Sequence, residues 1–120
     1  MPKVLIVDDE ESVSSMLEEF LGMNGYCCSV AASAAEARSL IRHKQFDLIL
    51  SDLNMPGESG FQLLRYVLSE RPGTSAILYT GYHTAEVKNK ALELGVTAYI
   101  TKPFSLGGLL SCVKGALAHR

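Results

Sequence analysis

Short apolar runs alternate with helical patterns along the whole chain. Five runs suited to strands fall at 3–7, 26–30, 47–51, 76–79 and 98–101, and a segment with helical spacing of apolar residues follows each. Parallel strands need crossover connections, and helices supply them, so this alternation predicts a parallel sheet covered on both faces. We expect an α/β fold of the doubly wound, flavodoxin-like (βα)5 type, with five parallel strands in the order 2-1-3-4-5.

Apolar stripes and end signals predict the helices. Asn24 and Gly25 end the first one, and Gly95 ends the fourth, because glycine readily adopts the left-handed conformation that closes a helix. Ser33 and Glu36 predict a capping box at the start of the second helix. The residues expected to face the sheet are Val13, Met16, Leu17, Phe20, Leu21, Ala37, Leu40, Ile41, Phe61, Leu64, Val67, Leu68, Val87, Ala91, Leu94, Leu106, Leu109, Leu110, Val113 and Leu117.

Composition narrows the classes of protein. The 120 residues suit one domain, 1–120, with 48% hydrophobic and 20% charged residues. The net charge of -2 and the lack of a basic stripe argue against direct nucleic-acid binding. No apolar run reaches the roughly 18–20 residues of a membrane span, and no signal peptide opens the chain, so we expect no membrane contact and a cytoplasmic location. The three cysteines lack the spacing of a metal site.

Polar side chains stand where the buried runs end. Asp8 and Asp9 follow the first run, Asp52 the third, Thr80 the fourth and Lys102 the fifth. Ligands of parallel sheets bind outside the carboxyl ends of the strands, and the expected order makes strands 1 and 3 neighbours. Three carboxylates, a hydroxyl and an amine are therefore predicted to converge at one edge.

Such an acidic cluster suits a divalent cation and a phosphoryl group. Two carboxylates 4 Å apart repel by about 4 kcal/mol at an effective dielectric near 20, so a cation is needed to neutralise them. Oxygen ligands at an open edge favour Mg²⁺. Asp52 would then act as a nucleophile that forms an aspartyl phosphate. Lys102 would stabilise the transferring group, and Thr80 would donate a hydrogen bond to it.

Four motifs resemble those of response-regulator receiver domains of two-component signalling, and the resemblance runs from Lys3 to about Leu117. They are Val-Asp-Asp at 7–9, Ser-Asp-Leu-Asn-Met-Pro-Gly at 51–57, Tyr-Thr-Gly at 79–81 and Tyr-Ile-Thr-Lys-Pro-Phe at 99–104. Each motif alone is weak. Together, in this order and at these strand ends, they are a strong indication of the family.

The resemblance implies a role for each residue of the motifs. It makes Asp52 the phosphoacceptor, with Mg²⁺ bound by Asp9, Asp52 and the backbone carbonyl of Asn54, and with Asp8 acting through water. Lys102 would pair with the phosphoryl oxygens, and the Lys102–Pro103 bond would be cis. Thr80 would be the switch hydroxyl, and the switch aromatic, Tyr99, would turn inward as Thr80 moves.

The resemblance also implies partners. The phosphoryl donor would be a phosphohistidine on a sensor histidine kinase or a phosphotransfer protein, and the output would be a downstream effector protein or domain. The signalling surface would be the fourth helix, fifth strand and fifth helix around Tyr82, Val87, Tyr99 and Leu106. Homodimerisation through this surface on phosphorylation is a further possibility.

A bulky Tyr82 would slow hydrolysis of the phosphoryl group.

Each of these residues also has an ordinary structural explanation. Asp8 and Asp9 can cap a helix, Asp52 can belong to a turn, and Tyr99 can be strand packing. We interpret Glu10 and Glu11 as the solvated first turn of the helix, and His43, His83 and His119 as surface residues. No single residue favours the phosphoacceptor interpretation. The joint placement of the three aspartates, Thr80 and Lys102 at strand ends does.

Two other functions use similar folds. An aspartate-nucleophile phosphohydrolase also forms an acyl phosphate, but its second acid transfers a proton, and Asn54 at the corresponding position cannot. A flavin carrier shares the topology, but the first loop lacks a phosphate cradle rich in glycine and hydroxyl groups. Thus we do not expect an enzyme, only a signalling phosphoacceptor that catalyses its own phosphotransfer and slow autodephosphorylation.

Overall fold

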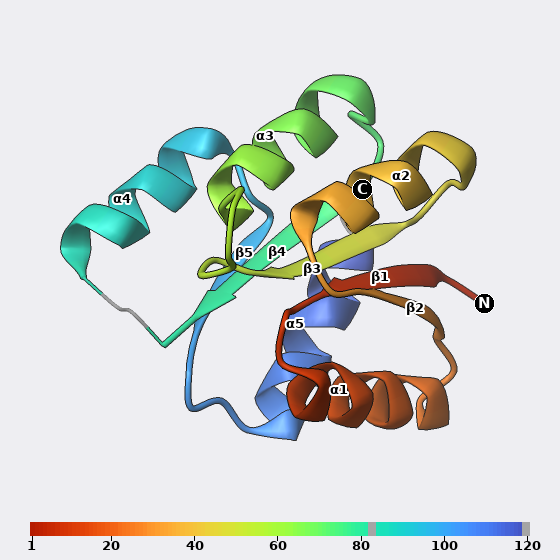
Figure 1. The fold of residues 1–120 in the computed structure, drawn as a ribbon. Coiled ribbons are helices and arrows are strands. Elements are labelled where there is room, and N and C mark those ends of the chain that lie inside the picture. The colour runs from red at the N-terminus through yellow and green to blue at the C-terminus, as the bar shows by residue number, and fades with distance from the viewer. Residues whose placement is uncertain (82–83, 119–120) are drawn as a thin grey trace.

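The computed structural model describes residues 1–81 and 84–118. Within them, strands and helices alternate from the first residues to the last (Figure 1). The elements are β1 (Lys3–Val7), α1 (Glu11–Met23), β2 (Cys27–Ala31), α2 (Ala34–His43), β3 (Leu48–Asp52), α3 (Gly60–Glu70), β4 (Ser75–Thr80), α4 (Ala85–Leu94), β5 (Ala98–Thr101) and α5 (Leu106–Ala118).

The strands form one parallel sheet in the order β2-β1-β3-β4-β5, as the sequence predicts. Their carboxyl ends point to the same side of the molecule, the left in Figure 1. Val7 pairs with Ser51, and Asp52 pairs with Tyr79. Asp8, which follows β1, is thereby placed next to the polar residues that end β3 and β4, Asp52 and Thr80.

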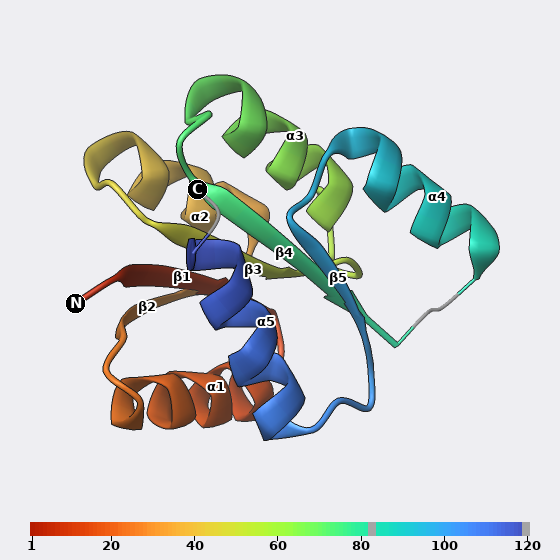
Figure 2. The ribbon, with the colours of Figure 1, turned by 180° about the vertical axis from the view of Figure 1, so that it is seen from behind.

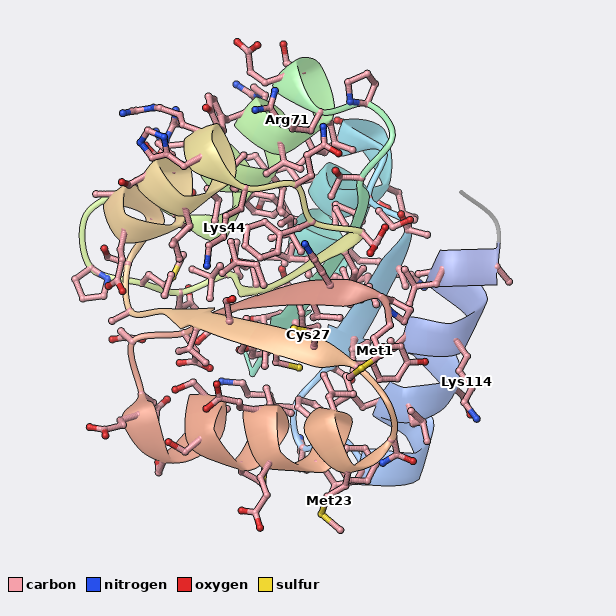
Figure 3. The ribbon with its side chains drawn as sticks, turned by 90° about the vertical axis from the view of Figure 1, so that its right-hand side faces the viewer. Met1, Met23, Cys27, Lys44, Arg71 and Lys114 are labelled. Atoms are coloured by element: carbon pink, nitrogen blue, oxygen red, sulfur yellow. The ribbon has the colours of Figure 1, made fainter. Side chains whose placement is uncertain are left out.

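Helices cover both faces of the sheet. Helices α1 and α5 lie on one face, and α2, α3 and α4 lie on the other (Figures 1 and 2). Successive residues of a strand face opposite sides of the sheet. Val4 and Ile6 pack in the cluster on the α1/α5 side, whereas Leu5 and Val7 pack in the cluster on the opposite side. Figure 3 shows this sandwich from the side, with side chains filling both layers.

The predicted boundaries differ from the observed ones by single residues. The strands at 3–7 and 98–101 match residue for residue, whereas β2 and β3 begin and end one residue later and β4 is longer by one residue at each end. Hydrogen bonding to a neighbouring strand defines these ends, and apolar patterns do not report it. The prediction that Met16 faces the sheet is wrong, because this side chain is 43% exposed. Leu17 and Leu21 are the fully buried residues of that stripe.

The helix ends follow the sequence signals with one exception. Gly25 and Gly95 have φ of 94° and 91°, the left-handed conformation expected of them. The predicted capping box at Ser33 is only half formed: Ser33 accepts from the Glu36 N–H, but the Glu36 carboxylate accepts from the N–H of Ala32. A complete box is found instead at the start of α3, between Ser59 and Gln62.

Gly60 lets α3 begin directly against the end of β3. A Cβ atom at this position would collide with the backbone oxygen of Asp52 and would lie 2.9 Å from the Cα of Leu53. The N–H of Gly60 donates to the Leu53 carbonyl at 3.0 Å. The close approach fixes the loop that follows Asp52, and any larger residue would push it away.

Some predictions concern residues that the structure does not describe. Tyr82, His83 and His119 lie outside residues 1–81 and 84–118, so the predictions about them stay predictions. Among the described helices, none has both the length and the apolar character needed to cross a bilayer.

Candidate functional site

Three carboxylates meet at the carboxyl ends of β1 and β3. One oxygen from each of Asp8, Glu10 and Asp52 lies within 4.8 Å of the other two. Asp8 directly follows β1 and is 1% exposed, whereas Asp52 ends β3 and is 3% exposed. Because β1 and β3 are neighbours in the sheet, the fold brings together two acids that are 44 positions apart in the chain.

The third member of this group is Glu10, whose side chain is exposed, as is that of Asp9. We expected Asp9 to be a direct ligand and Glu10 to lie in the solvated first turn of a helix. Asp9 is exposed and is not in the group found among the described residues, whereas Glu10 is. Asp8 Oδ1 accepts from the Glu10 N–H at 2.9 Å, and such a turn folds the chain back over the aspartate side chain. The acidic run after β1 indicates such a group, but the sequence does not show which acids of the run join it.

Asp52 is held by one ammonium group and one backbone N–H. Lys102 Nζ lies 3.4 Å from Asp52 Oδ2, and the N–H of Asn54 donates to Oδ1 at 3.2 Å. Burial raises the pKa of Asp52, Lys102 and the Asn54 N–H act in the opposite direction, and the negative charge of Asp8 raises the pKa further. The net shift is upward, so the anionic form of Asp52 is favoured less strongly than that of a solvent-exposed aspartate.

Asn54 connects the loop after β3 to the end of β4. Its side-chain amide donates to Thr80 Oγ1 at 3.3 Å. Thr80 is fully buried and ends β4, the strand beside β3. Thr80, Asn54 and Asp52 therefore form a continuous polar edge.

Tyr79 belongs to the site, although the sequence reasoning assigned it no role. Its hydroxyl donates to Asp8 Oδ2 at 2.7 Å, and its ring meets that of Phe104 edge-on with centroids 5.8 Å apart. Burial and then the charge of Asp8 raise the pKa of Tyr79 well above its usual range, so the phenol stays protonated. The only sequence signal was the motif Tyr-Thr-Gly at 79–81, because the register that pairs Tyr79 with Asp52 is not visible in the sequence. An aromatic residue in a buried strand is nevertheless usually core packing.

The segment after β5 brings Lys102 to the site. The Lys102–Pro103 peptide bond is cis, as the family resemblance implies.

The predicted switch aromatic, Tyr99, is half-buried and packs with Val87 against the cluster on the α2/α3/α4 side. Burial raises the pKa of Tyr99.

The donor set fits a hard divalent cation. Carboxylate oxygens are the ligands that Mg²⁺ prefers, and three of them lie within 4.8 Å of one another here. Two of the three acids are buried, and their mutual repulsion contributes to the raised pKa of Asp52. A cation bound among them would remove that repulsion. The acidic cluster thus meets the chemical requirements of a Mg²⁺ site.

The fold and this site together define a class of protein, and sequence comparison identifies the same class. Residues 4–114 match the profile of the response regulator receiver domain, so the chain belongs to this family. It is 36% identical over 118 residues to the response regulator protein PilR of Pseudomonas aeruginosa. It is also 38% identical over 114 residues to TorR, the TorCAD operon transcriptional regulatory protein of Escherichia coli.

The chain corresponds to a part of these relatives. The match covers 98% of this chain but 26% of PilR, and 95% of this chain but 49% of TorR. The chain thus spans about a quarter to a half of the curated relatives it matches. The activities and partners of the full-length relatives therefore do not follow for this chain.

Solved structures of receiver domains have the same fold. A CheY-like response regulator receiver domain protein from Methanospirillum hungatei superposes with a TM-score of 0.94 at 34% identity, covering 98% of this chain and 94% of the other. The chemotaxis protein CheY4 of Vibrio cholerae gives a TM-score of 0.90 at 32% identity, with coverage of 97% and 98%. The predicted fold class is confirmed in both strand order and helix placement.

Proposed function

We propose that Asp52 accepts a phosphoryl group from a phosphohistidine on a sensor histidine kinase or a phosphotransfer protein. The observation that supports this most is the environment of Asp52. It is a buried carboxylate with a raised pKa, close to two further acids and 3.4 Å from the Lys102 ammonium. Carboxylates with perturbed pKa values cluster at functional sites, which supports a chemical role for Asp52.

The transfer exchanges one bond to phosphorus for another. A carboxylate oxygen of Asp52 attacks the phosphorus atom, a P–O bond forms, and the P–N bond to the donor imidazole breaks. The electron pair of that bond stays on the imidazole nitrogen, which takes up a proton as it leaves. Little covalent chemistry is asked of the protein, so positioning and charge stabilisation supply the catalysis.

Mg²⁺ is the proposed cofactor. Asp52, Asp9 and the backbone carbonyl of Asn54 are its proposed direct ligands, with Asp8 acting through water and with Glu10 added because its carboxylate lies in the same group. When bound, the ion neutralises the carboxylates and offsets the negative charge of the phosphoryl group. Lys102 pairs with phosphoryl oxygens, since its ammonium already lies 3.4 Å from Asp52 Oδ2.

Phosphorylation then biases a switch. Thr80 leaves Asn54 to donate its hydroxyl to the phosphoryl group, and Tyr99 follows by turning inward. A phosphoryl group adds roughly -1.5 to -2 charge, which is enough to reorganise a loop held by weak polar contacts. The proposed output is a changed surface on α4, β5 and α5 that binds an effector protein or domain, and this surface is also the proposed route to a homodimer.

The remaining functional predictions follow from this role. The chain acts as a signalling phosphoacceptor over residues 1–120 and not as an enzyme that turns over phosphate esters, and its slow autodephosphorylation resets the switch. NtrC of Escherichia coli, 30% identical over 116 residues, is named a DNA-binding transcriptional regulator. We propose that DNA contact, where a protein of this type makes it, belongs to an effector region and not to this chain. A cytoplasmic location also stays a prediction.

Intact-mass measurement after incubation with acetyl phosphate and Mg²⁺ tests the proposal. Wild type should gain a single phosphate adduct, and Asp52→Asn should gain none. Asp47→Asn is the matched control, since Asp47 precedes β3 at the other end of the sheet and accepts from the Lys3 N–H at 2.7 Å. This variant should be phosphorylated like wild type. An adduct that persists in Asp52→Asn, or sustained turnover of a phosphate ester, would contradict the proposal.

A further inference from the structure

Tyr79 contacts both the acidic and the basic side of the site. Its hydroxyl reaches Asp8 Oδ2 at 2.7 Å, and Lys102 Nζ lies 5.2 Å from the centroid of its ring. It is fully buried in the layer between the sheet and α1/α5. We infer that Tyr79 is a positioning residue for the proposed Mg²⁺-dependent phosphoryl transfer, in which its hydroxyl orients Asp8 for the cation and its ring seats the Lys102 ammonium.

The register of the sheet explains how one side chain reaches both groups. Asp52 on β3 pairs with Tyr79 on β4, and Asp8 follows the β1 residue that pairs with Ser51. Asp8, Asp52 and Tyr79 therefore lie in one row across three adjacent strands. The phenol extends along this row from β4, past β3, to the acid that follows β1.

The hydroxyl completes the set of donors around Asp8. The carboxylate has two oxygens: Oδ1 accepts from the Glu10 N–H at 2.9 Å, and Oδ2 accepts from Tyr79. With one donor on each oxygen, the plane of this buried carboxylate is fixed before any ion arrives. Hydrogen bonds that orient the groups around a metal typically change its affinity by 10- to 100-fold. The inference therefore predicts a loss of Mg²⁺ affinity when the hydroxyl is removed.

The ring has a separate task. A cation over an aromatic face is attracted by about 0.5–1 kcal/mol at an exposed site, which corresponds to a two- to fivefold change in population. Lys102 is also 3.4 Å from Asp52 Oδ2, so the ring and the carboxylate hold its ammonium together. Phe104 packs against the same ring and keeps it in place.

Two substitutions separate these tasks. Tyr79→Phe removes the oxygen and keeps the ring, and Tyr79→Leu removes both. Titration of ¹⁵N-labelled protein with MgCl₂ alone, followed by amide chemical shifts, should give a dissociation constant about tenfold higher for both variants. At saturating Mg²⁺, the maximal rate of phosphorylation by acetyl phosphate should be two- to fivefold lower in Tyr79→Leu than in Tyr79→Phe, because only the leucine removes the ring.

Tyr26→Phe is the matched control. Tyr26 is a buried tyrosine of the same layer, but it immediately precedes β2 and so lies at the amino end of the sheet. Its substitution should leave Mg²⁺ affinity unchanged. Equal affinity of wild type and Tyr79→Phe would overturn the inference and leave the proposed function intact. A wild type that binds no Mg²⁺ would overturn both.

Folding of the variants is checked by their amide spectra. If Tyr79→Phe does not fold, the double variant with Asp8→Asn decides the matter, because it also removes the buried charge that the hydroxyl serves. Folding of the double variant supports the coupling between Tyr79 and Asp8. If the double variant also fails to fold, Tyr79 acts only in packing, and the inference is wrong.

Discussion

The two ends of the sheet differ in whether they bury charged side chains. At the carboxyl end, Asp8 and Asp52 are buried side by side, and Lys102 is the one ammonium within salt-bridge distance of them among the described residues. At the amino end, buried hydroxyls bond to backbone groups: Thr74 Oγ1 donates to the Phe46 carbonyl at 3.0 Å, and Ser75 Oγ donates to the Ala116 carbonyl at 3.1 Å.

The difference separates stability from function within one sheet. Neutral hydrogen bonds between a hydroxyl and a carbonyl are satisfied without any ligand, and each contributes about 1 kcal/mol. Adjacent buried carboxylates are satisfied only in part, as the raised pKa of Asp52 shows. The hydroxyl–carbonyl bonds at the amino end therefore stabilise the fold, whereas the carboxylates at the carboxyl end form the site that we propose for a cation and a phosphoryl group.

The largest effect is expected from Lys102→Ala. Removal of a positioned cation that stabilises charge in the transition state typically costs about 100-fold in rate. We expect the rate of Asp52 phosphorylation by acetyl phosphate to fall by about this factor, with little change in thermal stability. Lys114→Ala is the control, because this residue of α5 points away from the molecule (Figure 3). Similar rates for the two variants would show that Lys102 does not take part.

The amino end is tested by Thr74→Val, which keeps the shape of the side chain and removes its hydroxyl. The Phe46 carbonyl then loses a buried donor, so the free energy of unfolding should fall by about 1–2 kcal/mol. The rate of phosphorylation should stay that of wild type. Urea unfolding and the acetyl phosphate assay measure the two quantities. A loss of phosphorylation without a loss of stability would contradict the division between the two ends.

Asp52→Asn in metal-free buffer is expected to have a smaller effect on stability, and it should raise the free energy of unfolding rather than lower it. The folded-state pKa of Asp52 is raised, so the folded protein binds more protons than the unfolded chain between the unfolded and folded pKa values. At pH values above the folded pKa, ionised Asp52 therefore lowers the free energy of unfolding by its full amount. This effect decreases as the pH falls and disappears near the unfolded pKa of about 4. The variant should be more stable than wild type by about 1 kcal/mol at pH 7, and the gain should disappear near pH 4.

Thermal melts of both proteins across this pH range, in the presence of EDTA, measure that difference. Added Mg²⁺ should narrow the gap, because a bound cation stabilises the wild-type cluster and not the variant. Equal stability of the two proteins at pH 7 would show that Lys102 and the Asn54 N–H already compensate the charge of Asp52.

The sequence determined the fold class and most of the site. Buried runs that alternate with amphipathic segments permit few arrangements other than a parallel sheet covered by helices. Polar residues at the ends of such runs must then gather at one edge, because all strands of a parallel sheet end on the same side. Asp52, Asp8, Thr80 and Lys102 were predictable for this reason, and the left-handed Gly95 was predictable from its place after an apolar stripe.

Tertiary structure decided which neighbours of these residues take part. Whether Asp9 or Glu10 joins the carboxylate group depends on the turn that Asp8 makes with the Glu10 N–H, and a run of four acids, residues 8–11, does not specify that turn. Tyr79 and Asp8 are 71 positions apart and meet only through the pairing of three strands. Periodicity assigns a side chain to a face of the sheet, but contacts along a row across strands exist only once the strands have paired.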